Sequence, residues 1–234
     1  MLPHFRHRQT LIAPLISAVL AALCVGIGSS PASELAVHEL PTATPQHPTF
    51  VPLAPHMRYR AGGVTPTPTL SVPVRGWIGA QFVSHQHNKV RFETAWASWQ
   101  NGQPCSSTEC SGREVDIVSG PAMTETPAAM MARIHNKTWD FTPYDPPGPV
   151  QTWTIAGVPA LYFDATVPPG SPEWALVGVN PPELKVARDH AFRVSAFKIR
   201  GKTVVVVMQG PATDFVRYLP IAKRLVASLR FPAS

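Results

Sequence analysis

Charged residues and cysteines are both scarce in this sequence of 234 residues. Charged residues make up 15% of the chain, well below the usual ~25%. With three cysteines, the chain is neither a disulfide-dense mini-protein nor a holder of a zinc site with four cysteine ligands. Its 44% hydrophobic content excludes a chain that is disordered throughout. Its length suits one ordinary domain with appendages.

The short motifs that mark common catalytic sites are also missing. The sequence has no G-x-S-x-G elbow of a serine hydrolase. It has no H-E-x-x-H helix and no Walker loop either. We therefore predict no catalytic residue and no cofactor, and we expect a non-catalytic protein.

The first 32 residues have the basic, apolar and small-residue order of a secretory signal peptide. Arg6 and Arg8 precede the uncharged run 11–27, and we predict cleavage after Ala32. The alternative is a membrane anchor retained through residues 11–27, although this run spans roughly 25 Å as a helix against a hydrocarbon core of roughly 30 Å. Both interpretations predict an extracytoplasmic protein, either secreted or anchored at the outer face of the cytoplasmic membrane.

Basic residues slightly outnumber acidic ones. The formal net charge is +6, and removal of Arg6 and Arg8 with the leader lowers it to +4. Because no run of lysine and arginine stands out, we expect no nucleic-acid partner. The expected partner is an envelope protein or ligand whose identity the sequence does not give.

Proline is concentrated in one part of the chain. Nine prolines lie between residues 31 and 73. Proline fixes φ and lacks a backbone N–H, which excludes it from helix interiors and central strands. We therefore predict a Pro/Thr-rich spacer over residues 33–69 and a globular domain over residues 70–234. A disordered exported N-terminus is the alternative interpretation of the spacer.

Strand and helix patterns follow one another beyond residue 70. A helix is predicted from Thr126, with Met130, Met131 and Ile134 on its buried face. A second amphipathic helix begins near Phe215. Apolar or alternating patterns predict strands over 77–84, 89–99, 113–118, 151–155, 160–167, 173–179, 191–199 and 202–208. Strands in hairpins with two helices predict an α+β fold, with an antiparallel sheet flanked by helices in an α/β/α sandwich.

Several segments resemble exported bacterial domains with a Mog1/PsbP-like fold. They are RGWIG at 75–79, TPAAMMARI at 126–134, the hairpin WTIAGVPALYFDATVPPG at 153–170 and the final hairpin and helix at 190–231. The resemblance covers about residues 70–232 and implies an antiparallel sheet between helices. Members of this group are diverse accessory or binding proteins without one shared catalytic set, so the resemblance assigns no functional residue.

Cys105 and Cys110 are separated by four residues. In an oxidising compartment two close cysteines usually pair, so we predict a disulfide between them. Because the spacing differs from C-x-x-C, a redox or metal pair is the weaker alternative.

His85 and His87 form an H-x-H pair. If they lie on a strand they share a face and can both ligate one metal ion, with Glu93, Asp116 or His190 as a third ligand. If they lie in a turn between strands, they face water.

The leading functional hypothesis is an exported, non-catalytic accessory or binding domain of the cell envelope. It would act by binding a protein or ligand through a sheet or helix surface. The alternative is an envelope-associated hydrolase, metal-dependent or not, with an unrecognised site around His85, His87 and Asp116. We interpret Asp164, which lies in a strand pattern, as an outward-facing sheet carboxylate, with a buried base as the alternative.

Overall fold

The chain is described by a computed structural model. The described residues fall within one compact unit that spans positions 35–234. They are 36–43, 50–83, 88–94, 99–100, 103–104, 113–120, 123–136, 147–171, 174–178 and 183–232. Residues 11–27 lie outside this set. Within it, none of the helices has both the length and the apolar character to cross a membrane.

The described residues form two helices and a series of strands. The helices are α1 (Pro127–His135) and α2 (Phe215–Ala227). The N-terminal strands are β1 (Val37–Glu39), β2 (Thr42–Ala43), β3 (Val51–Leu53), β4 (Arg58–Arg60) and β5 (Thr69–Ser71). The remaining strands are β6 (Trp77–Val83), β7 (Asn88–Thr94), β8 (Trp99–Gln100), β9 (Gln103–Pro104), β10 (Glu114–Val118), β11 (Gln151–Ile155), β12 (Val158–Thr166), β13 (Trp174–Gly178), β14 (Glu183–Ala187), β15 (His190–Ile199) and β16 (Lys202–Pro211).

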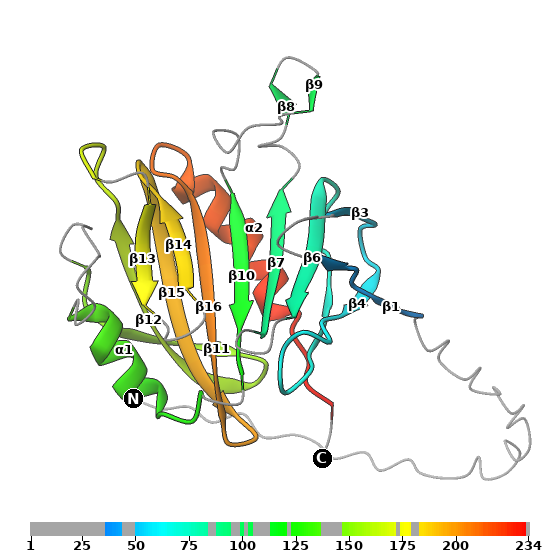
Figure 1. The fold of residues 1–234 in the computed structure, drawn as a ribbon, viewed down its shortest axis with the longest axis horizontal. Helices are drawn as coiled ribbons and strands as arrows, with labels where there is room; N and C mark the ends of the chain where they lie inside the picture. Colours follow the sequence, from blue (N-terminus) through cyan, green and yellow to red (C-terminus); the bar gives the residue numbers. More distant parts are fainter. Residues whose placement is uncertain are drawn as a thin grey trace, which may run out of the picture. The chain divides into compact units, whose positions relative to one another are not determined.

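A nine-stranded sheet dominates the fold (Figure 1). Its order is β11-β12-β15-β16-β10-β7-β6-β2, and β3 also pairs with β6. The neighbouring strands are antiparallel except for the parallel pair of β2 and β6. β16 lies in the middle, and its side chains from Thr203 to Gly210 are buried on both faces. The predicted antiparallel sheet is therefore confirmed, and the strand predicted over 202–208 is its doubly covered central strand.

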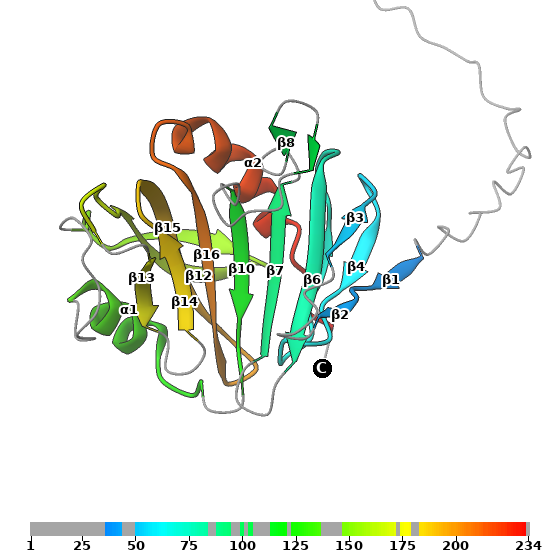
Figure 2. The same cartoon turned by 45° about the horizontal axis from the view of Figure 1, so that its top comes forward.

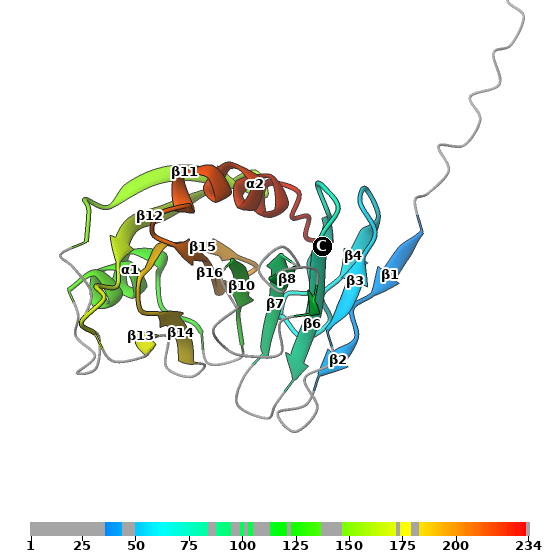
Figure 3. The ribbon, with the colours of Figure 1, turned by 90° about the horizontal axis from the view of Figure 1, so that it is seen from above.

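The two helices cover opposite faces of this sheet, as the view from above shows (Figure 3). On the α2 face, Val204, Val206 and Met208 of β16 pack with buried residues of α2. On the other face, Val205 and Val207 pack with the buried methionines of α1, and the β13–β14 hairpin adds Val186. The predicted α+β sandwich is confirmed. Strand β14 lies beyond the strand predicted over 173–179, and no sequence pattern predicts it.

The N-terminal strands contradict the spacer predicted over residues 33–69, for the residues of that range that the structure describes. β3 pairs with β6, and β4 pairs with both β1 and β5, beside β6 at the edge of the large sheet (Figure 2). Leu53, Tyr59 and Val64 are buried in the α2-face cluster. Apolar residues that can be buried lie between the prolines of this range. A prediction that rests on proline content alone does not take them into account. Pro52 is exposed in the edge strand β3, where a missing N–H is tolerated.

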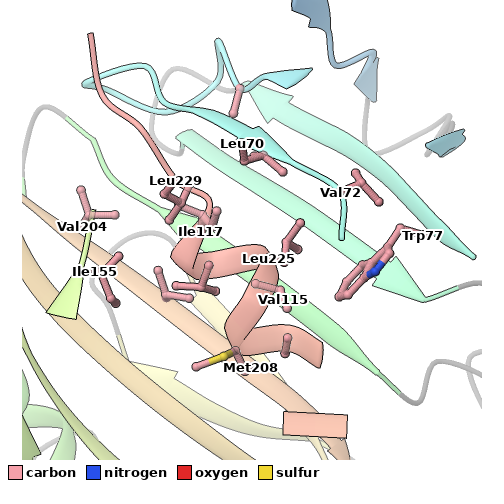
Figure 4. Packing of buried hydrophobic residues seen from close by; sticks show 14 of the residues in the cluster. Leu70, Val72, Trp77, Val115, Ile117, Ile155, Val204, Met208, Leu225 and Leu229 are labelled. Carbon is pink, nitrogen blue, oxygen red and sulfur yellow. The ribbon is translucent and has the colours of Figure 1, made fainter. Parts of the chain in front are cut away.

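The same N-terminal region is fastened to the end of α2. Thr69 and Arg230 exchange two backbone hydrogen bonds of 2.7 and 2.8 Å. The Ser228 hydroxyl accepts a hydrogen bond from the Ser71 N–H and donates one to the Ser71 carbonyl, both at 2.9 Å. Figure 4 shows Leu70 and Val72 packed near Leu225 and Leu229 within one apolar cluster. The described residues from 50 to 69 are thus part of the domain.

The β15–β16 hairpin turns at Arg200 and Gly201, which have φ values of 50° and 76°. Two successive positive φ values are typical of the type I′ turn that joins strands by two residues. The turn that the sequence predicted at these residues is confirmed.

Replacing Gly201 by alanine is expected to lower the free energy of unfolding by about 1 kcal/mol, because a Cβ is disfavoured at positive φ. No heavy atom lies within 4 Å of that added Cβ, so the cost comes from the backbone. Urea unfolding measures the change. Gly170→Ala is the control, because this site is equally open and has no positive φ. Equal effects of the two variants would contradict the turn assignment.

Candidate functional site

Some of the predicted site residues lie within the described part of the structure and others lie outside it. His85, His87, Cys105 and Cys110 lie outside the described residues, so the metal pair and the disulfide stay predictions. Asp116 is buried in β10. His190 begins β15, and its Nδ1 lies 3.0 Å from the Arg188 carbonyl oxygen. In the described part of the chain, no group of three His, Cys, Asp or Glu side chains is arranged to hold a metal ion.

A concavity lies between α2 and the strands β12 and β15, and we call it the α2 groove. Its volume is about 670 Å³, within the range of about 300–1,000 Å³ of small-molecule sites. Strands β12 and β15 supply one side and the first half of α2 supplies the other. The lining residues are Asp164, Ala165, Thr166, Ala191, Arg193, Phe215, Val216, Leu219, Pro220 and Lys223.

The strand side of the α2 groove carries a fixed guanidinium group. Arg193 donates two hydrogen bonds of 2.7 Å to the two carboxylate oxygens of Asp164. These residues lie opposite each other on β15 and β12. The guanidinium carbon also lies 4.0 Å from the centre of the Tyr162 ring. A bidentate pair stacked on a ring holds the guanidinium in one orientation.

Asp164 itself is about half exposed, with 47% of its side chain accessible. This position agrees with the predicted outward-facing sheet carboxylate and differs from the alternative of a buried base. No pattern in the sequence indicates its partner, because residues 164 and 193 meet only through the pairing of β12 with β15.

A second cation belongs to the α2 side of the groove. Lys223 Nζ lies 5.4 Å from the centre of the Trp153 ring, and Trp153 packs edge-on against Tyr162 with ring centroids 6.3 Å apart. Cation–π contact keeps the ammonium group close to the sheet. Both cations of the groove are therefore held in place by aromatic rings.

The α2 side is otherwise apolar. Val216 is 83% exposed, an unusual position for a large aliphatic side chain on the first turn of a helix. Phe215, Leu219 and Pro220 line the groove beside it. An exposed apolar wall that adjoins Lys223 and faces Arg193 suits a molecule that has an apolar body and an acidic group.

The fold places this chain among α+β domains with an antiparallel sheet between helices. It is similar to the solution structure of cyanobacterial PsbP (CyanoP) from Synechocystis sp. PCC 6803, with a TM-score of 0.44 and 10% identity over 77% of this chain and 95% of that chain. It is also similar to LpqN of Mycobacterium tuberculosis, described as involved in cell envelope biogenesis, with a TM-score of 0.32 and 10% identity over 79% and 91% of the two chains. No family model and no curated protein matches the sequence.

A PsbP is thus among the solved structures that this chain is similar to, as its sequence motifs predicted. Both TM-scores lie below 0.5 and both identities are 10%, so the function is inferred below from the side chains of the site.

Proposed function

We propose that this chain is an exported, non-catalytic binding domain of the cell envelope, and that its α2 groove holds an amphipathic ligand with an acidic group. The order of basic, apolar and small residues over positions 1–32 supports export. The groove supports binding, and the observation that carries the proposal is the exposed apolar wall of α2, which adjoins Lys223 and faces Arg193.

The charges of the α2 groove favour an acidic ligand. Its lining contains two cations, Arg193 and Lys223, and one carboxylate, Asp164. Asp164 already engages Arg193 through both oxygens, and Lys223 contacts a neutral ring. Lys223 is therefore the cation available to an incoming acidic group. Because Arg193 is already ordered, binding costs little further side-chain entropy there.

Reversing the charge of Lys223 tests the proposal. We expect Lys223→Glu to weaken binding of anilinonaphthalene sulfonate, an aromatic sulfonate, by about tenfold, since a favourable charge contact becomes repulsive. Fluorescence titration of the full chain measures the affinity. Val216→Asp, which makes the apolar wall polar, is expected to weaken binding as well.

Arg224→Glu is the matched control for this test. Arg224 is exposed on the same helix and does not line the α2 groove, and its reversal changes the net charge of the protein by the same amount. Binding to this variant is expected to stay within about twofold of the parent. Equal losses from Lys223→Glu and Arg224→Glu would overturn the assignment of the groove, because they would indicate a general charge effect.

A further inference from the structure

A second cavity lies on the other side of α2, between its first turns and the starts of β6 and β10; we call it the basic pocket. Its volume is about 330 Å³, at the lower end of the range for small-molecule sites of about 300–1,000 Å³. It shares no lining residue with the α2 groove. Its lining residues are Val74, Arg75, Trp77, Arg113, Asp214, Arg217, Tyr218 and Ile221.

Positive charge exceeds negative charge in this lining. Three arginines face one carboxylate, that of Asp214. Asp214 forms an ion pair with Arg113, and both side chains are mostly buried. Among the described residues, no carboxylate forms an ion pair with Arg75 or Arg217. Two guanidinium groups are therefore available to an anion that enters the pocket.

The basic pocket also contains buried donors that lack acceptors. Trp77 is 1% exposed, and its indole Nε1 has no hydrogen-bond partner among the described residues. Nε of Arg113 is likewise buried without a partner in that part of the chain. Buried N–H groups are nearly always hydrogen-bonded in folded proteins. Both groups only donate, so the group that satisfies them must be an acceptor.

The remaining walls of the pocket are apolar and aromatic. The rings of Trp77 and Tyr218 lie 6.3 Å apart between centroids, and Val74 and Ile221 add aliphatic surface. These walls suit a compact apolar or aromatic body, and the volume excludes a bulky one. The lining thus combines anion recognition with a small apolar surface.

We propose that the basic pocket is a second binding site, which takes a small organic anion. The carboxylate or phosphate group of the ligand accepts hydrogen bonds from Arg113 and Trp77 and is attracted by Arg75 and Arg217. The body of the ligand packs against the ring of Tyr218. This site is independent of the α2 groove, because the two linings lie on opposite sides of α2 and differ in every residue.

The test uses the full chain and three ring compounds: phenyl phosphate, benzoate and the neutral benzyl alcohol. Binding is followed by the ¹H–¹⁵N signal of the Trp77 indole, assigned from its absence in Trp77→Phe. We expect at least one anion to shift that signal and to bind about tenfold more tightly than benzyl alcohol, since only an anion satisfies the charged donors. The comparison of phosphate with carboxylate identifies the preferred acidic group.

Arg217→Gln is the informative variant, because Arg217 is exposed and its replacement leaves the fold intact. It is expected to weaken anion binding about fivefold, whereas Arg224→Gln on the same helix leaves it unchanged. Lys223→Glu, which disrupts the α2 groove, is also expected to leave it unchanged. Equal affinity for benzyl alcohol and both anions would overturn the proposed anion site, and so would an unchanged affinity in Arg217→Gln. Neither result would contradict the proposal for the α2 groove.

Discussion

Replacing Leu53 by alanine is expected to lower the free energy of unfolding by about 2–5 kcal/mol. Leu53 is 4% exposed and belongs to the apolar cluster on the α2 face of the sheet. The truncation removes buried methyl groups and leaves a cavity between β3 and its neighbours. Denaturation in urea, followed by far-ultraviolet circular dichroism, measures the loss.

Val37→Ala is the control for this experiment. Val37 lies in β1 of the same N-terminal region but is 38% exposed, so its truncation should change stability by less than about 0.5 kcal/mol. If Leu53→Ala were as harmless as Val37→Ala, residues before position 70 would behave as the spacer that their prolines suggest. That result would contradict the packing of β3 against the rest of the domain.

Phe163→Ala is expected to cost about 3–5 kcal/mol. Phe163 is fully buried on the α1 face, and its ring makes edge contacts with Phe192 at 6.3 Å and with His135 of α1 at 5.3 Å between centroids. Removal of the ring takes away one of the side chains that pack with α1 in this cluster. Thermal and urea unfolding should therefore both shift, and hydrogen exchange in α1 should rise.

Two further variants separate this effect from a general weakening of β12. Phe163→Leu keeps most of the apolar volume and is expected to cost less than half as much, about 1–2 kcal/mol. Leu161→Ala truncates a half-buried residue of the same strand and cluster and should also cost less. Similar losses in all three variants would show that α1 does not depend on Phe163, against the layered packing described above.

The proposed sites lie on opposite sides of α2, and single changes on that helix address each of them. Lys223 lines the α2 groove, Arg217 lines the basic pocket, and Arg224 lines neither. Variants at these three positions therefore separate loss of the amphipathic ligand, loss of the small anion and a general effect of net charge. Both proposed sites therefore take part of their lining from α2.

Local elements of this protein followed from the sequence because the interactions that form them are local. Thr126 accepts a hydrogen bond from the Ala129 N–H at the start of α1, a contact across three residues. The glycine at position 201 signals the turn between β15 and β16 through its own backbone preference. The sequence predicted an amphipathic helix near Phe215 but did not place Tyr218 on its buried face, where the structure has it.

Only the tertiary structure decided the role of the N-terminal strands and the location of the two cavities. Proline density predicted a spacer, but Leu53 and Tyr59 are buried through contacts with strands and a helix far along the chain. Asp164 meets Arg193 because β12 pairs with β15, and Trp77 meets Arg113 and Arg217 because β6, β10 and α2 converge. Such contacts depend on the pairing of strands over long sequence separations, which residue patterns along the chain do not specify. The sequence therefore determined the class of fold and its local turns and caps, whereas the charged and apolar groups that make the binding sites are brought together by the folded sheet and α2.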